Sequence, residues 1–196
     1  MKSFLSFSFL LIVVAALAQP NHIYNCYDLD KVLKHPEQVY QLEINSAGYK
    51  VNGAYQSLSD LPEQLTQFSN LEVLYIKETN LEEISNVLTQ LTTLKELYIS
   101  KNWELTRLPD NIEALQQLEI LKLSFNNLSS LPKGISALPK LKSLDLTGNY
   151  ISQLPEGLLE MPSLEELKVI GNKLPKADMA KAVSYTHLRA HETRIH

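Results

Sequence analysis

Hydrophobic residues recur along this chain with a period close to 23 residues. The most complete unit, residues 118–140, contains apolar residues, one asparagine and one proline in a fixed order: Leu118, Leu121, Leu123, Asn126, Leu128, Leu131, Pro132, Ile135 and Leu138. Equivalent units begin at leucines spaced by 23, 24, 23 and 23 residues: Leu71, Leu94, Leu118, Leu141 and Leu164. Self-similarity at a fixed period of this length indicates a tandem array of structural repeats.

Each unit predicts a short strand, a turn and a single helical turn. Leu121 and Leu123 are two residues apart, so both can point inward from one strand while the residue between them points outward. Asn126 falls where the chain leaves the strand, and its amide can pair with backbone groups that would otherwise be buried without partners. Ile135 and Leu138 are three residues apart, which places them on one side of a helical turn.

This pattern resembles the leucine-rich repeat family, with 23-residue repeats of the Ras-group-like and bacterial type. The resemblance implies an α/β fold: a right-handed curved solenoid with a concave parallel sheet and short convex helices or turns. One unit cannot bury its apolar face alone, whereas stacked units form a continuous core. We expect about six repeats over residues 39–182, the first with a loop insertion and the last incomplete because the leucine pattern stops after Pro175.

Two repeats depart from the pattern. The first is longer than its neighbours, and its extra residues include Gly48–Tyr55, where two glycines and two tyrosines predict a loop or small hairpin. Insertions of this kind often lie on the binding face of repeat proteins, but tolerance of added length also accounts for them. In the second repeat Thr79 stands at the asparagine position, and we expect its turn to be the weakest.

The N-terminal 38 residues divide into two predicted segments. Residues 1–18 have the parts of a signal peptide: Lys2, an uncharged apolar run, and small residues ending at Ala18. The run is short for a membrane span, although an uncleaved anchor helix stays open. We therefore expect an exported chain (secreted, periplasmic or at the cell surface), with no membrane span after cleavage. Residues 19–38 predict an N-terminal segment with a helix, capped by Asp28, that covers the end of the array.

The C-terminal residues 183–196 break the repeat pattern and contain His187, His191 and His196. A metal site is one interpretation of clustered histidines. However, the stretch resembles, residue for residue, a translated sequencing-library adapter, and we predict that it is a non-native tail.

Composition argues against several classes of function. The chain of 196 residues has 44% hydrophobic and 20% charged residues and a net charge of −4, which suits one globular domain and offers no basic cluster for nucleic acid. Cys26 is its only cysteine, so an internal disulfide is impossible. The repeats contain no glycine-rich phosphate loop, no histidine pair at metal spacing and no recognisable nucleophile with its base. We predict no catalytic, cofactor-binding or metal-binding residues, and therefore a protein that is not an enzyme.

Function is expected on the outward positions of the strands. Equal repeat spacing aligns these positions into rows, of which the central one is Glu43, Tyr75, Tyr98, Lys122, Asp145 and Lys168. The candidate partner-binding patch combines apolar and aromatic residues with a charged border: Val73, Tyr75, Lys77, Glu96, Tyr98, Ile120 and Lys122. This composition is typical of protein interfaces, although tyrosine is also a good strand residue. We expect a non-enzymatic module that binds a protein or peptide, or alternatively the recognition arm of a larger enzyme or receptor.

Overall fold

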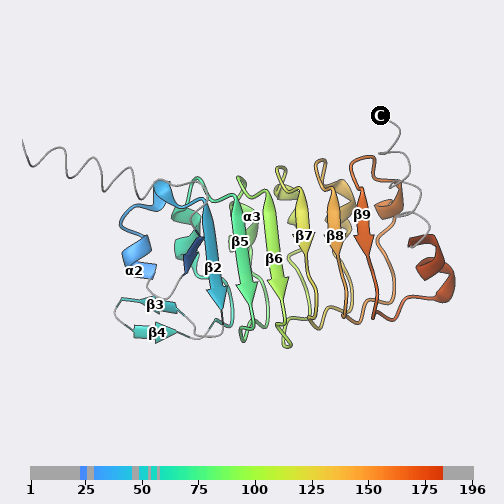
Figure 1. Cartoon of the computed structure of the whole chain (residues 1–196), viewed down its shortest axis with the longest axis horizontal. Helices are drawn as coiled ribbons and strands as arrows, with labels where there is room; N and C mark the ends of the chain where they lie inside the picture. The colour runs from blue at the N-terminus through green and yellow to red at the C-terminus, as the bar shows by residue number, and fades with distance from the viewer. Residues whose placement is uncertain (1–22, 26–28, 46–48, 53, 57, 183–196) are drawn as a thin grey trace, which may run out of the picture.

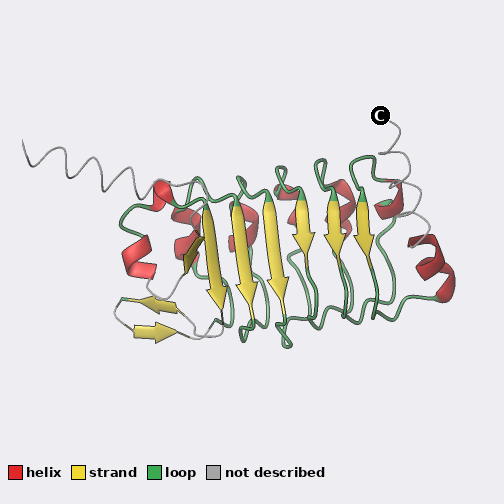
Figure 2. Cartoon of the chain, in the orientation of Figure 1, coloured by secondary structure: helices red, strands yellow, loops and turns green. Residues whose placement is uncertain are grey.

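The structure is a computed structural model that describes residues 23–25, 29–45, 49–52, 54–56 and 58–182. The repeats stack side by side into a solenoid. Each contributes a strand to one sheet, and short helices or irregular turns follow on the opposite side (Figure 1). The colouring of Figure 2 separates the row of strands from the helices behind it.

The main sheet contains seven parallel strands in the order β1-β2-β5-β6-β7-β8-β9. Their bounds are β1 Ile23–Asn25, β2 Gln41–Asn45, β5 Val73–Lys77, β6 Glu96–Ser100, β7 Ile120–Lys122, β8 Ser143–Asp145 and β9 Glu166–Lys168. Tyr75 pairs with Tyr98, and Tyr98 pairs with Lys122, so the predicted central row is confirmed. A slip of one residue would have moved every leucine to the other face of the sheet.

The opposite side of the solenoid is built from short helices. Their bounds are η2 Glu63–Gln67, α3 Val87–Gln90, η3 Ile112–Ala114, η4 Lys133–Ala137 and η5 Leu158–Glu160. Pro62 and Pro132 precede η2 and η4 in an extended conformation, which the proline ring favours just before a helical turn. One residue of each such turn, for example Leu65 or Ile135, is fully buried against the strands.

The core runs unbroken between the sheet and these helices. Inward strand residues such as Leu74, Leu97, Leu121 and Leu144 are 0% exposed. They belong to one hydrophobic cluster that extends from Leu29 to the C-terminal end of the described chain. Stacking therefore buries the apolar face that no single repeat could bury alone.

The N-terminal end is capped more extensively than the sequence predicts. Helix α2 (Leu29–Val32) buries Leu29 completely, and η1 (Pro36–Gln38) follows it. Strand β1, which the leucine pattern does not predict, lies beyond β2 and forms the edge of the sheet. The predicted cap Asp28, together with Cys26, lies outside the described residues, as do the proposed signal peptide and the tail 183–196.

The insertion in the first repeat contains a small hairpin, one of the two structures predicted for it. Strands β3 (Tyr49–Val51) and β4 (Ala54–Gln56) pair antiparallel apart from the main sheet. The backbone N–H of Asn52, at its tip, donates to Asp30 Oδ1 over 2.9 Å. The hairpin is therefore held to helix α2.

The sixth repeat continues beyond Pro175, where the leucine pattern predicts its end. Residues 176–182 are helical, with Met179 packed against the core and Ala182 completely buried. Small and unbranched residues in these positions lack the leucine spacing of the other repeats, which explains why the pattern does not reveal the helix.

Candidate protein-binding face

A ladder of buried asparagines holds neighbouring repeats in register. Asn126 Nδ2 donates to the carbonyl oxygens of Leu123, in its own repeat, and Ile99, in the preceding one, at 2.8 and 2.9 Å. Its Oδ1 accepts the backbone N–H of Asn102 at 2.9 Å. The predicted role of this position is confirmed, because the amide satisfies three backbone groups that have left the sheet ladder.

Two tyrosines dominate the outer sheet face, by which we mean the outward-pointing residues of the main sheet. The rings of Tyr75 and Tyr98 are stacked, with centroids 4.6 Å apart and planes inclined by 17°. Lys77 Nζ lies 4.7 Å from the Tyr75 centroid, and Lys122 Nζ lies 5.5 Å from that of Tyr98. Since each ring uses one face on the other ring, the lysines occupy the remaining faces, and a partner would meet ring edges and hydroxyl groups.

Hydrogen bonds and ion pairs fix this cluster. The Tyr98 hydroxyl donates to Glu96 Oε2 over 2.7 Å, and Lys77 Nζ lies 3.5 Å from Glu43 Oε2. Burial, together with the Glu96 carboxylate, raises the pKa of Tyr98. Burial, with the charges of Glu96 and Glu43, likewise raises the pKa of Tyr75. Both phenols therefore stay neutral at physiological pH and keep their hydroxyl protons for donation.

The other predicted patch residues differ in how much surface they expose on the outer sheet face. Ile120 and Lys122 lie beside Glu96 and Tyr98 in the register and are partly exposed. Val73 also points outward but is only 9% exposed. Its register partners Gln41 and Glu96 carry long side chains on either side of it. Val73 therefore offers little surface, and its part in binding, like that of the whole patch, stays a prediction.

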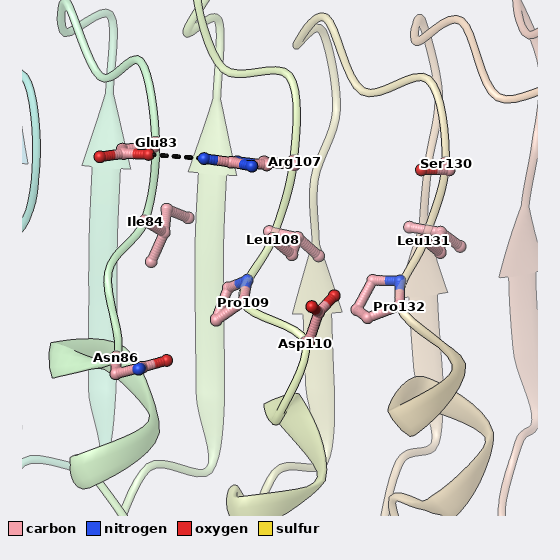
Figure 3. Close-up of a pocket in the computed structure, with 10 residues that line it drawn as sticks. All are labelled: Glu83, Ile84, Asn86, Arg107, Leu108, Pro109, Asp110, Ser130, Leu131 and Pro132. Atoms are coloured by element: carbon pink, nitrogen blue, oxygen red, sulfur yellow. Dashed lines mark hydrogen bonds and ion pairs between the residues drawn. The ribbon is translucent and has the colours of Figure 1, made fainter.

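A groove on the helical side was not predicted from the sequence. It has a volume of about 350 Å³ and crosses repeats two to four, as Figure 3 shows. Ile84, Leu108 and Leu131 line its middle, while Glu83 and Arg107 form a 3.0 Å ion pair at one border. The repeated Leu-Pro pair, at 108–109 and 131–132, is the sequence signal that could have indicated it. Apart from this ion pair, its polar side chains form no cluster suited to a defined chemistry.

Two further observations concern the part of the chain that the structure describes. Within it, no group of three or more histidine, cysteine, aspartate or glutamate side chains is placed to hold a metal ion. Likewise, none of the helices in these ranges has the length and apolar composition needed to cross a membrane.

Comparison with known proteins agrees with the repeat geometry. A family model described as leucine rich repeat matches residues 116–174. The leucine-rich repeat domain of the type III effector XopL is 26% identical, with a TM-score of 0.63 over 84% of this chain and 57% of that one. Residues 116–174 match the leucine-rich repeat family, and the chain has the fold of a leucine-rich repeat solenoid.

Two further comparisons show how far this similarity extends. An internalin from Listeria monocytogenes is 19% identical, with a TM-score of 0.55 over 79% of this chain and 42% of that one, which shows the fold alone. An adenylate cyclase from Schizosaccharomyces pombe is 35% identical over 91 residues, which is 44% of this chain and 5% of that protein. The chain thus spans a small part of this curated relative. Leucine-rich repeat domains typically serve as protein-interaction modules and are generally non-enzymatic scaffolds.

Proposed function

We propose that this leucine-rich repeat protein binds a protein or peptide through the outer, concave face of its sheet. The observation that carries the proposal is the stack formed by Lys77, Tyr75, Tyr98 and Lys122 across β5, β6 and β7. A partner would contact an aromatic centre with a charged border, the arrangement common at the energetic centre of protein interfaces.

The rigidity of the stack favours binding. The rings, the Tyr98–Glu96 hydrogen bond and the Lys77–Glu43 ion pair restrain side chains that would otherwise lose rotamer freedom when a partner docks. The Tyr75 hydroxyl donates to no group in the described part of the chain, so its proton is available to an acceptor on the partner. Such preorganisation lowers the entropic cost of association.

The test is a double substitution, Tyr75→Ala with Tyr98→Ala. Pull-down with the mature chain identifies a partner, which is then purified so that its affinity can be measured by calorimetry. Truncation of a central aromatic anchor costs about 2 kcal/mol or more, and the effects of two stacked rings are not additive, so we expect affinity to fall by at least about 30-fold. Circular dichroism and the urea midpoint should show that the variant is folded.

Gln116→Ala is the matched control, because Gln116 is exposed next to η3 on the helical side and its side chain donates to the nearby Glu113 carbonyl. It should bind normally. Normal binding by the tyrosine double variant would reject the sheet face. A loss on Gln116→Ala, or on deletion of residues 48–55, would instead place the site on the helical side or in the hairpin.

A second candidate is that these repeats form the recognition arm of a larger enzyme or receptor. The similarity to a short part of a much longer adenylate cyclase supports it. Sequencing the uninterrupted gene would decide between the two, since an open reading frame that ends soon after the repeats would exclude a larger polypeptide.

We also propose that the protein is exported, on the strength of the signal-like pattern in residues 1–18. Expression with and without this segment, followed by mass measurement of secreted or periplasmic material, tests the proposal. Cleavage after Ala18 supports it, whereas an intact chain retained in the cytoplasm would contradict it.

A further inference from the structure

The large exposed hydrophobic residues of the described chain gather at one rim of the solenoid. Trp103, Phe125, Tyr150 and Ile170 are 62%, 46%, 49% and 68% exposed. Each lies within two residues of a ladder asparagine, in the turn that follows a strand, so all four lie at the edge toward which the strand arrows point in Figure 1. Exposed apolar residues are ordinary when scattered, but a group on one edge marks an interaction surface. We call these four residues the rim patch.

Phe125 has a left-handed backbone conformation, which phenylalanine rarely adopts. Its φ is 58°, and the equivalent residues Glu78, Lys101, Gly148 and Gly171 have φ between 54° and 76°. Glycine adopts this left-handed conformation freely, whereas residues with a Cβ atom do not. Glu78 and Lys101 share this conformation, and their side chains form a 2.6 Å ion pair with each other.

The Phe125 ring rests in the space that the missing side chain of Gly148 leaves. A Cβ atom added at Gly148 would lie 2.7 Å from Cδ1 of the ring. The ring is thus held against the backbone of the next repeat and yet is 46% exposed. Strain retained at an exposed, well-positioned side chain is a reason to look for a function, since glycine serves at the same position in the next two repeats.

The rim patch is complementary to itself. Phe125 lies in the fourth repeat, Trp103 one repeat before it and Tyr150 one repeat after it. Glu104 follows Trp103 at one end, and Lys173 lies 4.7 Å over the Tyr150 ring at the other. Neither charge has an ion-pair partner among the residues that the structure describes. A second copy running antiparallel would bring opposite charges and aromatic rings together.

We propose that the rim patch is the interface of a homodimer whose twofold axis passes near Phe125. In an isologous interface, residue i of one subunit contacts residue j of the other and the reverse. Phe125 meets its own copy at the axis, Trp103 packs against Tyr150 of the partner subunit, and Glu104 faces Lys173 of the partner subunit. The occupant is a second copy of this chain, because the charge order along the rim fits itself when reversed.

The dimer should be weak. Four side chains at a rim form an interface below the roughly 1,200 Å² at which stable complexes begin, so we expect a dissociation constant of about 10–100 µM. Trp103 is the only tryptophan in the chain and lies in the rim patch, so its fluorescence reports directly on burial of this surface.

Sedimentation velocity and tryptophan emission, followed from about 1 to 500 µM protein, test the proposal. The wild type should shift from monomer to dimer as Trp103 emission moves to shorter wavelength. Phe125→Gly should raise the dissociation constant at least tenfold. Because glycine removes the backbone strain, the urea midpoint of this variant should not fall in step with the loss of dimer.

Charge substitutions test the predicted antiparallel pairing. Lys173→Glu should weaken the dimer, and adding Glu104→Lys in the same chain should restore it, because each pair is then opposite in sign again. Glu160→Lys, at an exposed carboxylate on the helical side, is the matched control and should have no effect. A wild type that stays monomeric throughout, a dimer indifferent to Phe125→Gly, or failure of the double charge variant to recover would each overturn the proposal.

Discussion

The turns of the second and fourth repeats occupy the same place in the solenoid but are satisfied differently. In the fourth, the Asn126 amide bonds to its own repeat, to the carbonyl of Ile99 and to the N–H of Asn102. In the second, the N–H and hydroxyl of Thr79 donate to Asn102 Oδ1 over 3.0 and 2.6 Å. Thr79 therefore reaches the next repeat, and among the described residues its hydroxyl makes no bond back to the first.

This difference separates two functions that asparagine combines. A hydroxyl has one donor, which Thr79 uses on Asn102, whereas a carboxamide has two donors as well as an acceptor and can bond to both neighbouring repeats. Within the part of the chain that the structure describes, the first and second repeats are joined by the sheet ladder, the core, the Lys77–Glu43 pair and the bond from the Ser85 N–H to Asp60 Oδ1. Thr79 adds no carboxamide to this junction. The sequence-based expectation that the Thr79 turn is the weakest has this structural basis and stays a prediction until stability is measured.

The largest expected effect concerns the core, because the second and fourth repeats bury equivalent leucines. Leu74→Ala and Leu121→Ala remove equivalent, fully buried side chains, and each should destabilise the fold by about 2–5 kcal/mol. Lys122→Ala, next to Leu121 but outward, should change stability by less than about 0.5 kcal/mol. Urea denaturation measures all three. Equal midpoints for the Leu121 and Lys122 variants would contradict the register of the sheet.

The comparison of the turns is tested most directly by Asn126→Ala. It leaves buried backbone groups without partners, so we expect a loss of about 2–4 kcal/mol in unfolding free energy. Thr79→Ala removes the hydroxyl bond to Asn102 and the longer one accepted from the Leu81 N–H, and should cost about 0.5–1.5 kcal/mol. If both variants lose the same stability in urea, the additional hydrogen bonds of the asparagine do not contribute to the free energy of unfolding.

A substitution in the opposite direction should repair the weaker turn. Thr79→Asn supplies an amide that can donate to the carbonyl of Ile44, the counterpart of the Asn126 bond to Ile99. We expect a gain of about 0.5–1.5 kcal/mol in thermal or urea unfolding. Asn126→Thr is the paired control and should lose stability. A destabilised Thr79→Asn would show that the first repeat is not placed to accept the amide.

The smallest effect concerns the exposed Glu78–Lys101 pair, which spans the second and third turns at 2.6 Å. The hydrogen bond from Lys101 lowers the pKa of Glu78 below its ordinary value of 4.5. The contribution of this ion pair to folding stability is therefore present above pH 4.5 and is lost as pH falls through the lowered pKa of Glu78. Glu78→Gln should lower the urea midpoint slightly at pH 7 in low salt and not at pH 3. A difference that persists at pH 3 or in high salt would exclude an electrostatic origin.

The sequence predicts the rows of the sheet because side chains alternate along a strand and the repeats are nearly equal in length. Tyr75 and Tyr98 could be placed side by side on these two facts alone. The burial of Val73 depends on the lengths of neighbouring side chains, and the left-handed φ of Phe125 depends on the packing of the turn, so neither follows from spacing. Strand β1 and the helix at 176–182 escaped prediction because they lack the leucine pattern that identifies the strands and helical turns of the repeats.

The direction of the hydrogen bonds in the asparagine ladder makes the two ends of the solenoid unequal in how readily a terminal repeat detaches. The N–H of Thr79, Asn102, Leu128 and Ile151 each donates to an asparagine in the following repeat. Detaching a repeat on the C-terminal side leaves such a donor without its acceptor, whereas detaching one on the N-terminal side leaves Asn102 its own-repeat acceptor, Ser100. Local opening should therefore progress from the C-terminal side, and amide hydrogen exchange at these four positions should slow in steps from Ile151 back toward the middle of the stack.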